Sequence, residues 1–338
     1  MNRLLMEFLA QGAGVTGVTA ALRRAVARPG SGGGFHVFCY HRIGAGRGPF
    51  FAGTPVAAFE RQCAFLARHY RVLPLVELVR RSRNGEAVGD AAAITFDDGY
   101  RDNLLVALPV LARHRLPATI FLTTAAIGTG EPLWHDRVAW VLERTERRSL
   151  ELEAGGQCRT LRLETRAKRL AVVGDVCEAL KAVPELEKQR AIEALRRVAG
   201  VADYRGLARD MLDWDDVRAM TRRGVAFGAH TVNHPILTRL PLEEARSEIR
   251  ESKRRIEAET GEPCETFAYP NGLPGDFDPA IEALVDQEGF ACGASRGLGA
   301  NPPGGNPYDV RRWTPLEESM PAFALRLAWW ARAGGRGA

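Results

Sequence analysis

The stretch AITFDDGYRDN, residues 93–103, places two adjacent aspartates at the end of an apolar, β-prone run. The run is typical of a buried strand, and Gly99 follows the two aspartates directly. Neighbouring carboxylates repel each other and lose hydration when buried, so a buried pair needs a positive partner. An Asp-Asp-Gly sequence by itself is more often a solvated turn than a functional site. At this point the pair could be a solvated turn or part of a functional site, and the rest of the sequence is needed to decide between the two.

Similar short apolar runs recur along the chain and alternate with helical patterns. We expect strands at 35–41, 91–98, 118–124, 225–230, 265–270, 289–295 and 308–313, with a weaker one at 70–75. Apolar residues at helical spacing lie between them, at 55–69, 103–115, 240–261 and 278–289. Strands that alternate with helices indicate parallel βα units. This α/β pattern predicts a distorted (β/α) barrel of about seven parallel strands.

One long segment, 136–212, interrupts this alternation. It is rich in charge and mostly helical, with one β-like patch at 158–164. We interpret it as a mainly helical insertion on one face of the barrel. The predicted organisation is listed here in chain order: an N-terminal helix and linker (1–34), a first part of the barrel (35–135), the insertion (136–212), a second part of the barrel (213–315) and a C-terminal helix or tail (316–338).

The composition is that of a globular protein. Hydrophobic residues make up 46% of the 338 and charged residues 26%. The net charge of +5 is spread along the chain, and no run of like charge indicates binding to nucleic acid. Only four of the 46 basic residues are lysines, at positions 168, 181, 188 and 253. The six cysteines are scattered without a CxxC pair, which argues against a disulfide framework.

The first 28 residues predict an amphipathic helix that lies on a membrane or on the domain itself. Glu7 and Gln11 interrupt the apolar stretch, and no clean cleavage site follows it. No uninterrupted run approaches the roughly 20 apolar residues of a membrane span. We therefore expect a cytoplasmic or membrane-peripheral protein rather than an exported one.

Polar side chains gather where the predicted strands end. In parallel α/β folds the carboxyl ends of the strands meet on one rim, and ligands bind there. The residues at or just after four of these ends are His41, Asp97, Asp98, His230, His234 and Tyr269. One such coincidence would mean little, but four together indicate a site.

The spacing of His230 and His234 puts both imidazoles on one side if the loop coils for one turn. Two histidines and one carboxylate are a common ligand set for a divalent metal, with positions left for water. Asp98 can supply that carboxylate while Asp97 faces the cleft. A lone HxxxH is often structural, and Thr231 excludes the HExxH of zinc proteases. His41 alone could be a core histidine, and we assign no role to the histidines at 36, 69, 114 and 135.

Three motifs together resemble the polysaccharide deacetylase family, also called the NodB-homology domain or carbohydrate esterase family 4. They are TFDDGY (95–100), HTVNHP (230–235) and FAYPNG (267–272). The segment FCYHRIG (38–44) resembles a circularly rearranged branch, in which an N-terminal histidine replaces one found late in other members. The resemblance spans about 35–315. It implies a distorted (β/α) barrel and metal-dependent removal of acetyl groups from N-acetylated sugars in a glycan or glycan precursor.

The resemblance also implies a role for each motif residue. Asp97 matches the general base and His41 the general acid. Asp98, His230 and His234 match the ligands of one divalent metal, zinc before Co²⁺, Ni²⁺ or Mn²⁺. The backbone N–H of Tyr269 matches the oxyanion donor, and Pro270, as the next residue, would hold Tyr269 in an extended conformation and face the substrate.

The chain also departs from the family pattern. No arginine precedes the proline in CETFAYP (264–270), and the late Leu-x-His motif is missing. An arginine that orients the base could then come from Arg311 or Arg312, and we count Arg312 among the substrate-facing residues. Trp134, at the entry to the insertion, could stack on a sugar ring or equally well be a packing residue.

Three other functions remain open at this stage. The chain could be a catalytically silent glycan-binding relative, although a binding protein has no use for a general base. It could be a deformylase or amidase on a non-sugar or lipid-linked substrate, because specificity lies in loops. A phosphotransfer or nuclease site is disfavoured, since no phosphate-binding glycine loop accompanies the aspartates.

Overall fold

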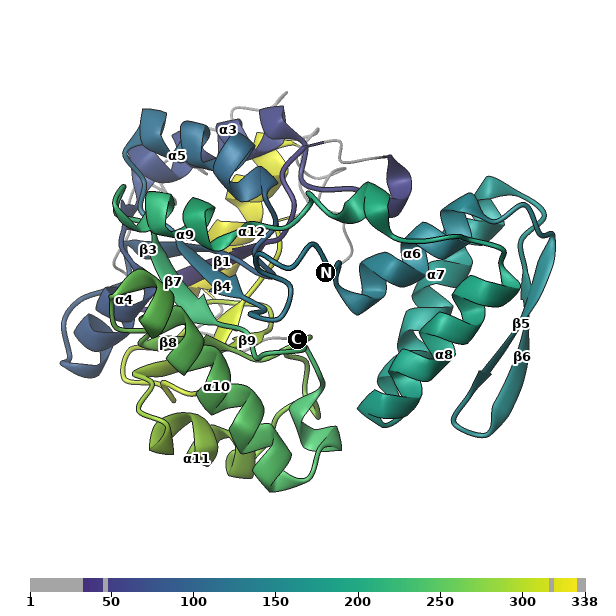
Figure 1. Ribbon diagram of the computed structural model, residues 1–338. Coiled ribbons are helices and arrows are strands. Elements are labelled where there is room, and N and C mark those ends of the chain that lie inside the picture. Colours follow the sequence, from purple (N-terminus) through teal and green to yellow (C-terminus); the bar gives the residue numbers. More distant parts are fainter. Residues whose placement is uncertain (1–32, 45–47, 316–318, 333–338) are drawn as a thin grey trace.

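The computed structural model describes residues 33–44, 48–315 and 319–332, and its centre is a parallel sheet (Figure 1). The strands are β1 (His36–Tyr40), β2 (Arg71–Val72), β3 (Ala91–Phe96), β4 (Thr119–Leu122), β7 (Ala226–Ala229), β8 (Thr266–Ala268), β9 (Cys292–Arg296) and β10 (Val310–Arg312). Seven of them follow the order β1-β3-β4-β7-β8-β9-β10, and β2 pairs with the start of β3. Every expected strand is therefore present.

The two ends of this path meet at Trp313. Its N–H donates to the Val37 carbonyl over 3.1 Å, and its carbonyl accepts from the Cys39 N–H over 3.0 Å. The sheet is thus nearly closed, and the predicted distorted barrel of seven parallel strands is confirmed.

Helices surround the barrel (Figure 1). They are α3 (Val56–His69), α4 (Leu75–Arg83), α5 (Leu108–His114), α9 (Trp214–Thr221), α10 (Leu242–Thr260), α11 (Pro279–Gln287) and α12 (Met320–Arg332). Short turns of 3-10 or π-helix lie at Pro49–Phe51, Asn103–Ala107, Arg205–Leu207 and Leu237–Arg239. Strands β1 and β3 are buried along their whole length, which explains their continuous apolar sequences.

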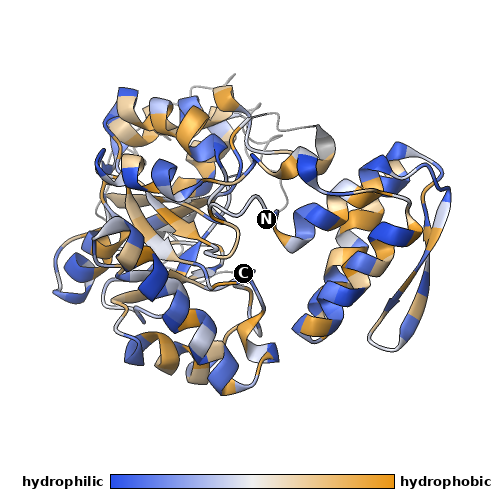
Figure 2. Cartoon of the chain, in the orientation of Figure 1, coloured by the Kyte–Doolittle hydropathy of each residue, from blue (hydrophilic) through white to orange (hydrophobic). Residues whose placement is uncertain are grey.

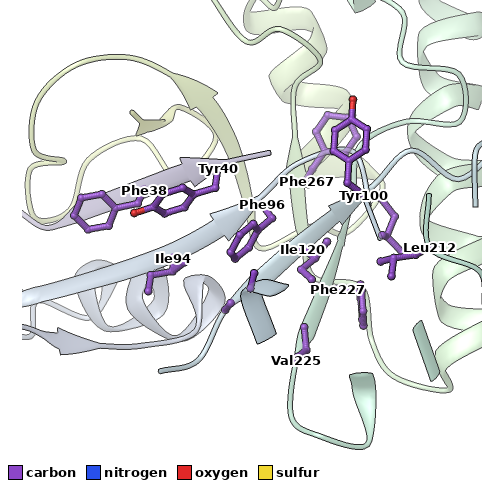
Figure 3. Packing of buried hydrophobic residues seen from close by; sticks show 14 of the residues in the cluster. Phe38, Tyr40, Ile94, Phe96, Tyr100, Ile120, Leu212, Val225, Phe227 and Phe267 are labelled. Atoms are coloured by element: carbon purple, nitrogen blue, oxygen red, sulfur yellow. The ribbon is translucent and has the colours of Figure 1, made fainter. Parts of the chain in front are cut away.

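Alternate residues of these strands enter different hydrophobic clusters. Phe38, Tyr40, Ile94 and Phe96 pack into the larger cluster, which includes side chains of the surrounding helices (Figure 3). The intervening Val37 of β1 joins a second cluster, which also includes residues of β3 and of α4. Both faces of the sheet are thereby covered by apolar side chains, and the polar residues are left to the strand ends.

The insertion forms a lobe beside the barrel with its own hydrophobic cluster (Figure 1). It contains α6 (Trp134–Arg144), β5 (Ser149–Ala154), β6 (Gln157–Arg162), α7 (Arg166–Lys181) and α8 (Glu185–Val198). Its helices α6 and α8 carry apolar residues on one side and polar residues on the other (Figure 2). We expected one β-like patch, but β5 and β6 form an antiparallel hairpin. The hairpin turns at Gly155 and Gly156, whose φ values of 60° and 68° suit a tight hairpin turn.

The predicted N-terminal helix lies outside the described residues. Within the described parts of the chain, no helix is both long enough and apolar enough to cross a bilayer.

Candidate active site

The paired aspartates leave β3 in a backbone conformation that separates their side chains. Asp97 still pairs with the neighbouring strand, since its N–H donates to the Tyr40 carbonyl over 2.9 Å. Asp98 and Gly99 then take φ values of 77° and 84°, in the left-handed region. The left-handed φ of residue 99 favours glycine, and a Cβ there would also lie 2.8 Å from the side-chain ends of Ile127 and Leu122. The two carboxylates consequently have entirely different partners.

Asp98 faces the two histidines of the HTVNH loop. Its Oδ1 lies 3.8 Å from Nε2 of His230 and 3.6 Å from Nε2 of His234. The Nδ1 of His230 contacts the carbonyl of Ala268 over 2.7 Å; a carbonyl can only accept, so Nδ1 carries the proton and Nε2 presents a lone pair. Asp98 Oδ1 is buried and has no hydrogen-bond partner among the described residues. A buried carboxylate oxygen between two imidazole lone pairs fits a bound cation.

The pKa shifts of Asp98 and of the two histidines agree with a bound cation at this position. Burial and the charge of Asp97 raise the pKa of Asp98 well above its usual range, so the bare carboxylate is unfavourable there. Burial lowers the pKa of His230 to about 4, and burial with the neighbouring His230 lowers that of His234. Both imidazoles are therefore neutral near pH 7, as metal binding requires. These residues fit one divalent metal with nitrogen and oxygen ligands.

The histidine loop is shaped by a residue from α10. Thr231 and His234 have φ values of 66° and 59°, and the Thr231 hydroxyl accepts the His234 N–H over 3.0 Å. The carboxylate of Glu248 accepts the N–H groups of Val232 and Asn233 over 2.8 and 2.9 Å. Glu248 was not among our predicted residues, since nothing in a helical, charge-rich segment distinguishes it from its neighbours.

Asp97 is held on the other side of the pair by an arginine. Arg312 donates from both terminal nitrogens, over 2.5 Å to Oδ1 and 2.9 Å to Oδ2. The Cys39 thiol also donates to Oδ2, over 3.3 Å. Burial raises the pKa of Asp97, but the charges of Arg312, His230 and His41 together with the Arg312 hydrogen bonds outweigh it, so the net pKa lies well below the usual range. Asp97 is thus ionised near pH 7.

His41 lies next to Asp97 at the open rim. Its Nε2 is 3.9 Å from Asp97 Oδ2, and its side chain is 48% exposed. The Asn103 side chain donates to the His41 carbonyl over 2.8 Å and fixes the loop after β1. The structure therefore brings His41, Asp97, Asp98 and the two loop histidines together at one rim.

The predicted role of the Tyr269 N–H is wrong. That N–H donates to the Ala294 carbonyl of β9 over 3.0 Å, because Tyr269 continues the hydrogen bonding between β8 and β9 by one residue. Its ring is 1% exposed. Pro270 is buried in the bend that follows and has no N–H. Asn271 has a φ of 63°, and no described residue accepts its N–H, so it is the open backbone donor of this loop.

Two residues predicted to face the substrate are enclosed instead. Arg312 is 2% exposed and engaged with Asp97, so it positions that carboxylate and does not reach the cleft. Trp134 is 5% exposed within the hydrophobic cluster of the insertion, and the Lys188 ammonium lies 4.7 Å from its ring centroid. No free ring face is left for a sugar, so the packing alternative holds for Trp134.

The insertion touches both motif loops through four residues that we had not predicted. Arg42 pairs with Asp136 over 2.9 Å, and its guanidinium lies 3.8 Å from the centroid of the Tyr100 ring. The Tyr100 hydroxyl hydrogen-bonds His135 over 3.0 Å, and the His135 ring is 5.7 Å from that of His234. The only available signal was that Arg42 and Tyr100 stand inside the FCYHRIG and TFDDGY motifs.

A parallel barrel with an Asp-His-His cluster and a second, arginine-held aspartate at its rim has the arrangement of groups that a hydrolase uses, including residues that fit a metal. Residues 84–291, more than half of the chain, match the family described as polysaccharide deacetylase, and the chain belongs to that family. It is accordingly a carbohydrate N-deacetylase. The match begins after FCYHRIG, so placement in the rearranged branch stays a prediction. No curated protein matches the chain.

Solved structures of deacetylases share the fold. IcaB from Ammonifex degensii has a TM-score of 0.56 at 18% identity, covering 89% of this chain and 98% of its own. The deacetylase PplD from Streptococcus pyogenes, solved with acetate, has a TM-score of 0.54 at 16% identity, with 86% and 96% covered. A de-N-acetylase from Aggregatibacter actinomycetemcomitans has a TM-score of 0.52 at 14% identity, with 86% and 99% covered.

Proposed function

We propose that this protein hydrolyses the N-acetyl group of an N-acetylated amino sugar in a glycan or glycan precursor and releases acetate, with one divalent metal. The observation that carries the proposal is the division of labour between the two aspartates. Asp98 converges with His230 and His234, whereas Asp97 is ionised and held apart by Arg312. Zinc suits two imidazoles and one carboxylate best, with Co²⁺, Ni²⁺ and Mn²⁺ as alternatives.

Asp98, His230 and His234 would hold the metal, which when bound polarises the acetyl carbonyl and lowers the pKa of water. Asp97 would accept a proton from the attacking water. Its low pKa makes it a weak base in equilibrium terms, but Arg312 and Cys39 fix its orientation. Proton transfer by a positioned carboxylate typically contributes about 10²–10⁴-fold in rate.

An amide also needs a stabilised oxyanion and a proton for its departing nitrogen. The Asn271 N–H lies in the loop after β8, whose Ala268 carbonyl contacts His230, and we assign this N–H as the backbone donor to the oxyanion. His41, half-exposed and next to Asp97, would protonate the amine as it leaves. Acid and base would then come from two neighbouring strand ends, β1 and β3.

The test is an acetate-release screen with zinc-loaded and chelator-treated protein. Substrates are chitooligosaccharides, poly-N-acetylglucosamine, peptidoglycan fragments and lipid- or nucleotide-linked N-acetyl sugars. We expect release from at least one, its loss with chelator and its return with metal. Formate release from an N-formyl sugar in place of acetate would support the deformylase alternative, and no release from any glycan would overturn the proposal.

A further inference from the structure

We propose that a cleft between the insertion and the barrel binds an anionic group of the glycan and so selects acidic N-acetylated substrates. This inference rests on the proposed deacetylase function and names its substrate class. Trp134, Lys181 and Lys188 line the cleft from the insertion, and His234 and Asn271 line it from the barrel.

The cleft adjoins the reaction centre. His234 is a predicted metal ligand, and Asn271 carries the N–H that we assign to the oxyanion, so both mark where the acetyl group would lie. The space inside is about 20 Å³, which accommodates roughly one water-sized group. The cleft can therefore receive one oxygen of a carboxylate or phosphate group that the sugar carries, and not a second sugar ring.

The lining of the cleft has a surplus of positive charge. Lys181, Lys188 and Arg239 contribute three cations, against the single carboxylate of Glu185. Glu185 pairs with Lys188 over 2.5 Å. Lys181 donates to the Asn271 side chain over 3.0 Å, and its acidic partner Glu178 is 72% exposed. Cations in a partly dehydrated cleft attract an anion more strongly than they would in open water.

A buried donor without an acceptor also points to a ligand. The Nε1–H of Trp134 is buried and has no hydrogen-bond partner among the described residues. Leaving such a donor unsatisfied costs free energy that an acceptor group would recover. An oxygen of a bound oxyanion can accept this N–H beside the ammonium of Lys188, which already lies against the Trp134 ring.

The choice of lysine supports the same interpretation. The chain has 46 basic residues and only four lysines, yet two of those four line this cleft. A compact ammonium fits a narrow site that a planar guanidinium would fill. Lys168 lies on the same helix as Lys181, is 55% exposed and pairs with Glu164, so it provides a matched control.

The experiment compares acetate release from neutral and acidic substrates by wild type, Lys181→Gln, Lys188→Gln and Lys168→Gln. The substrates are chitohexaose, which is neutral, peptidoglycan glycan strands, which carry lactyl carboxylates, and UDP-N-acetylglucosamine, which carries phosphates. We expect wild type to have a higher kcat/KM for a carboxylated or a phosphorylated substrate, and the two arms identify which anion is used. Either cleft variant should lower the acidic-to-neutral ratio about tenfold or more, through KM.

Lys168→Gln should behave as wild type. Equal kcat/KM for acidic and neutral substrates, or an unchanged ratio in both cleft variants, would overturn the inference. Lys188 is buried, so the half-buried Lys181 provides the variant that folds if Lys188→Gln does not.

Binding separates this inference from the proposed function. Calorimetry with N-acetylmuramic acid, N-acetylglucosamine 1-phosphate and N-acetylglucosamine needs no turnover. If no glycan releases acetate, the proposed function fails, but tighter binding of either acidic sugar that depends on Lys181 still supports the anion site. Equal binding of all three sugars rejects the site even where acetate is released.

Discussion

At the scale of single residues, the site depends on the different surroundings of the adjacent carboxylates of Asp97 and Asp98. Asp97 is bound by Arg312, whereas Oδ1 of Asp98 faces His230 and His234 and has no hydrogen-bond partner among the described residues, although the two aspartates are adjacent in sequence. Substitutions on either side of the pair should therefore have different consequences.

Asp97→Asn removes the base but leaves Asp98, His230 and His234 untouched. We expect the variant to keep its metal and to lose acetate release by roughly 10²-fold or more. His234→Ala should lose both metal and activity. Metal content by elemental analysis and acetate release, measured on the same samples, distinguish the two outcomes. Near-normal turnover by Asp97→Asn would show that another group is the base.

Arg312→Lys should lower activity with metal content unchanged. A single ammonium cannot reproduce the two parallel hydrogen bonds to Asp97, so the carboxylate loses its fixed orientation. We expect kcat to fall about tenfold or more while KM changes little. Arg311→Lys is the matched control, because the Arg311 guanidinium bonds the Ala300 carbonyl and not Asp97. Equal losses in both variants would contradict the positioning role.

At the scale of elements, the insertion is a packed lobe and not a loose loop. Its helices bury their own hydrophobic cluster, and α6 contacts both motif loops through His135 and Asp136. Its integrity should therefore affect the site as well as the stability of the lobe.

Two glycines of the insertion should respond in opposite directions to alanine. A Cβ on Gly206 would lie 1.9 Å from the buried Trp140 ring, so Gly206→Ala should destabilise the protein by about 1–3 kcal/mol. Gly174 lies inside α7 with nothing within 4 Å of such a Cβ, and Gly174→Ala should stabilise the protein by about 0.5–1 kcal/mol. Urea denaturation of both variants measures the two changes. A neutral Gly206→Ala would mean that Trp140 repacks freely.

At the scale of the whole molecule, one buried histidine on β1 makes folding depend on pH. His36 is 1% exposed, its Nδ1 has no partner among the described residues, and burial lowers its pKa from 6.5 to about 4. The unfolded chain binds the proton more readily, so the contribution of His36 to stability is complete above pH 6.5. It decreases as the pH falls from 6.5 to about 4.

His36→Leu should remove this part of the pH dependence. We expect wild type to lose up to about 3 kcal/mol more than the variant between neutral pH and pH 4, since one pKa unit corresponds to about 1.4 kcal/mol. The free energy of unfolding of both proteins, measured across this range, isolates His36 from the carboxylates that titrate in both. Parallel curves would show that His36 has the same pKa when folded and unfolded.

Much of this architecture was predictable from the chain alone. All eight expected strands are present, and the residues at their ends meet at one rim, because parallel strands necessarily bring their carboxyl ends together. Asp98, His230 and His234 were identifiable for the same reason. The β5–β6 hairpin was missed because the alternation of leucines around Gly155 and Gly156 is short and lies among charged residues.

The tertiary structure alone decided which partner each polar group has. Arg312 reaches Asp97 across 215 positions of sequence, and the Tyr269 N–H is lost to a strand that enters the sheet later. Local patterns determine strands, helices and the residues at their ends, because those depend on near neighbours. Hydrogen-bond partners and the cleft beside His234 depend on segments distant in sequence, and only their packing brings them together.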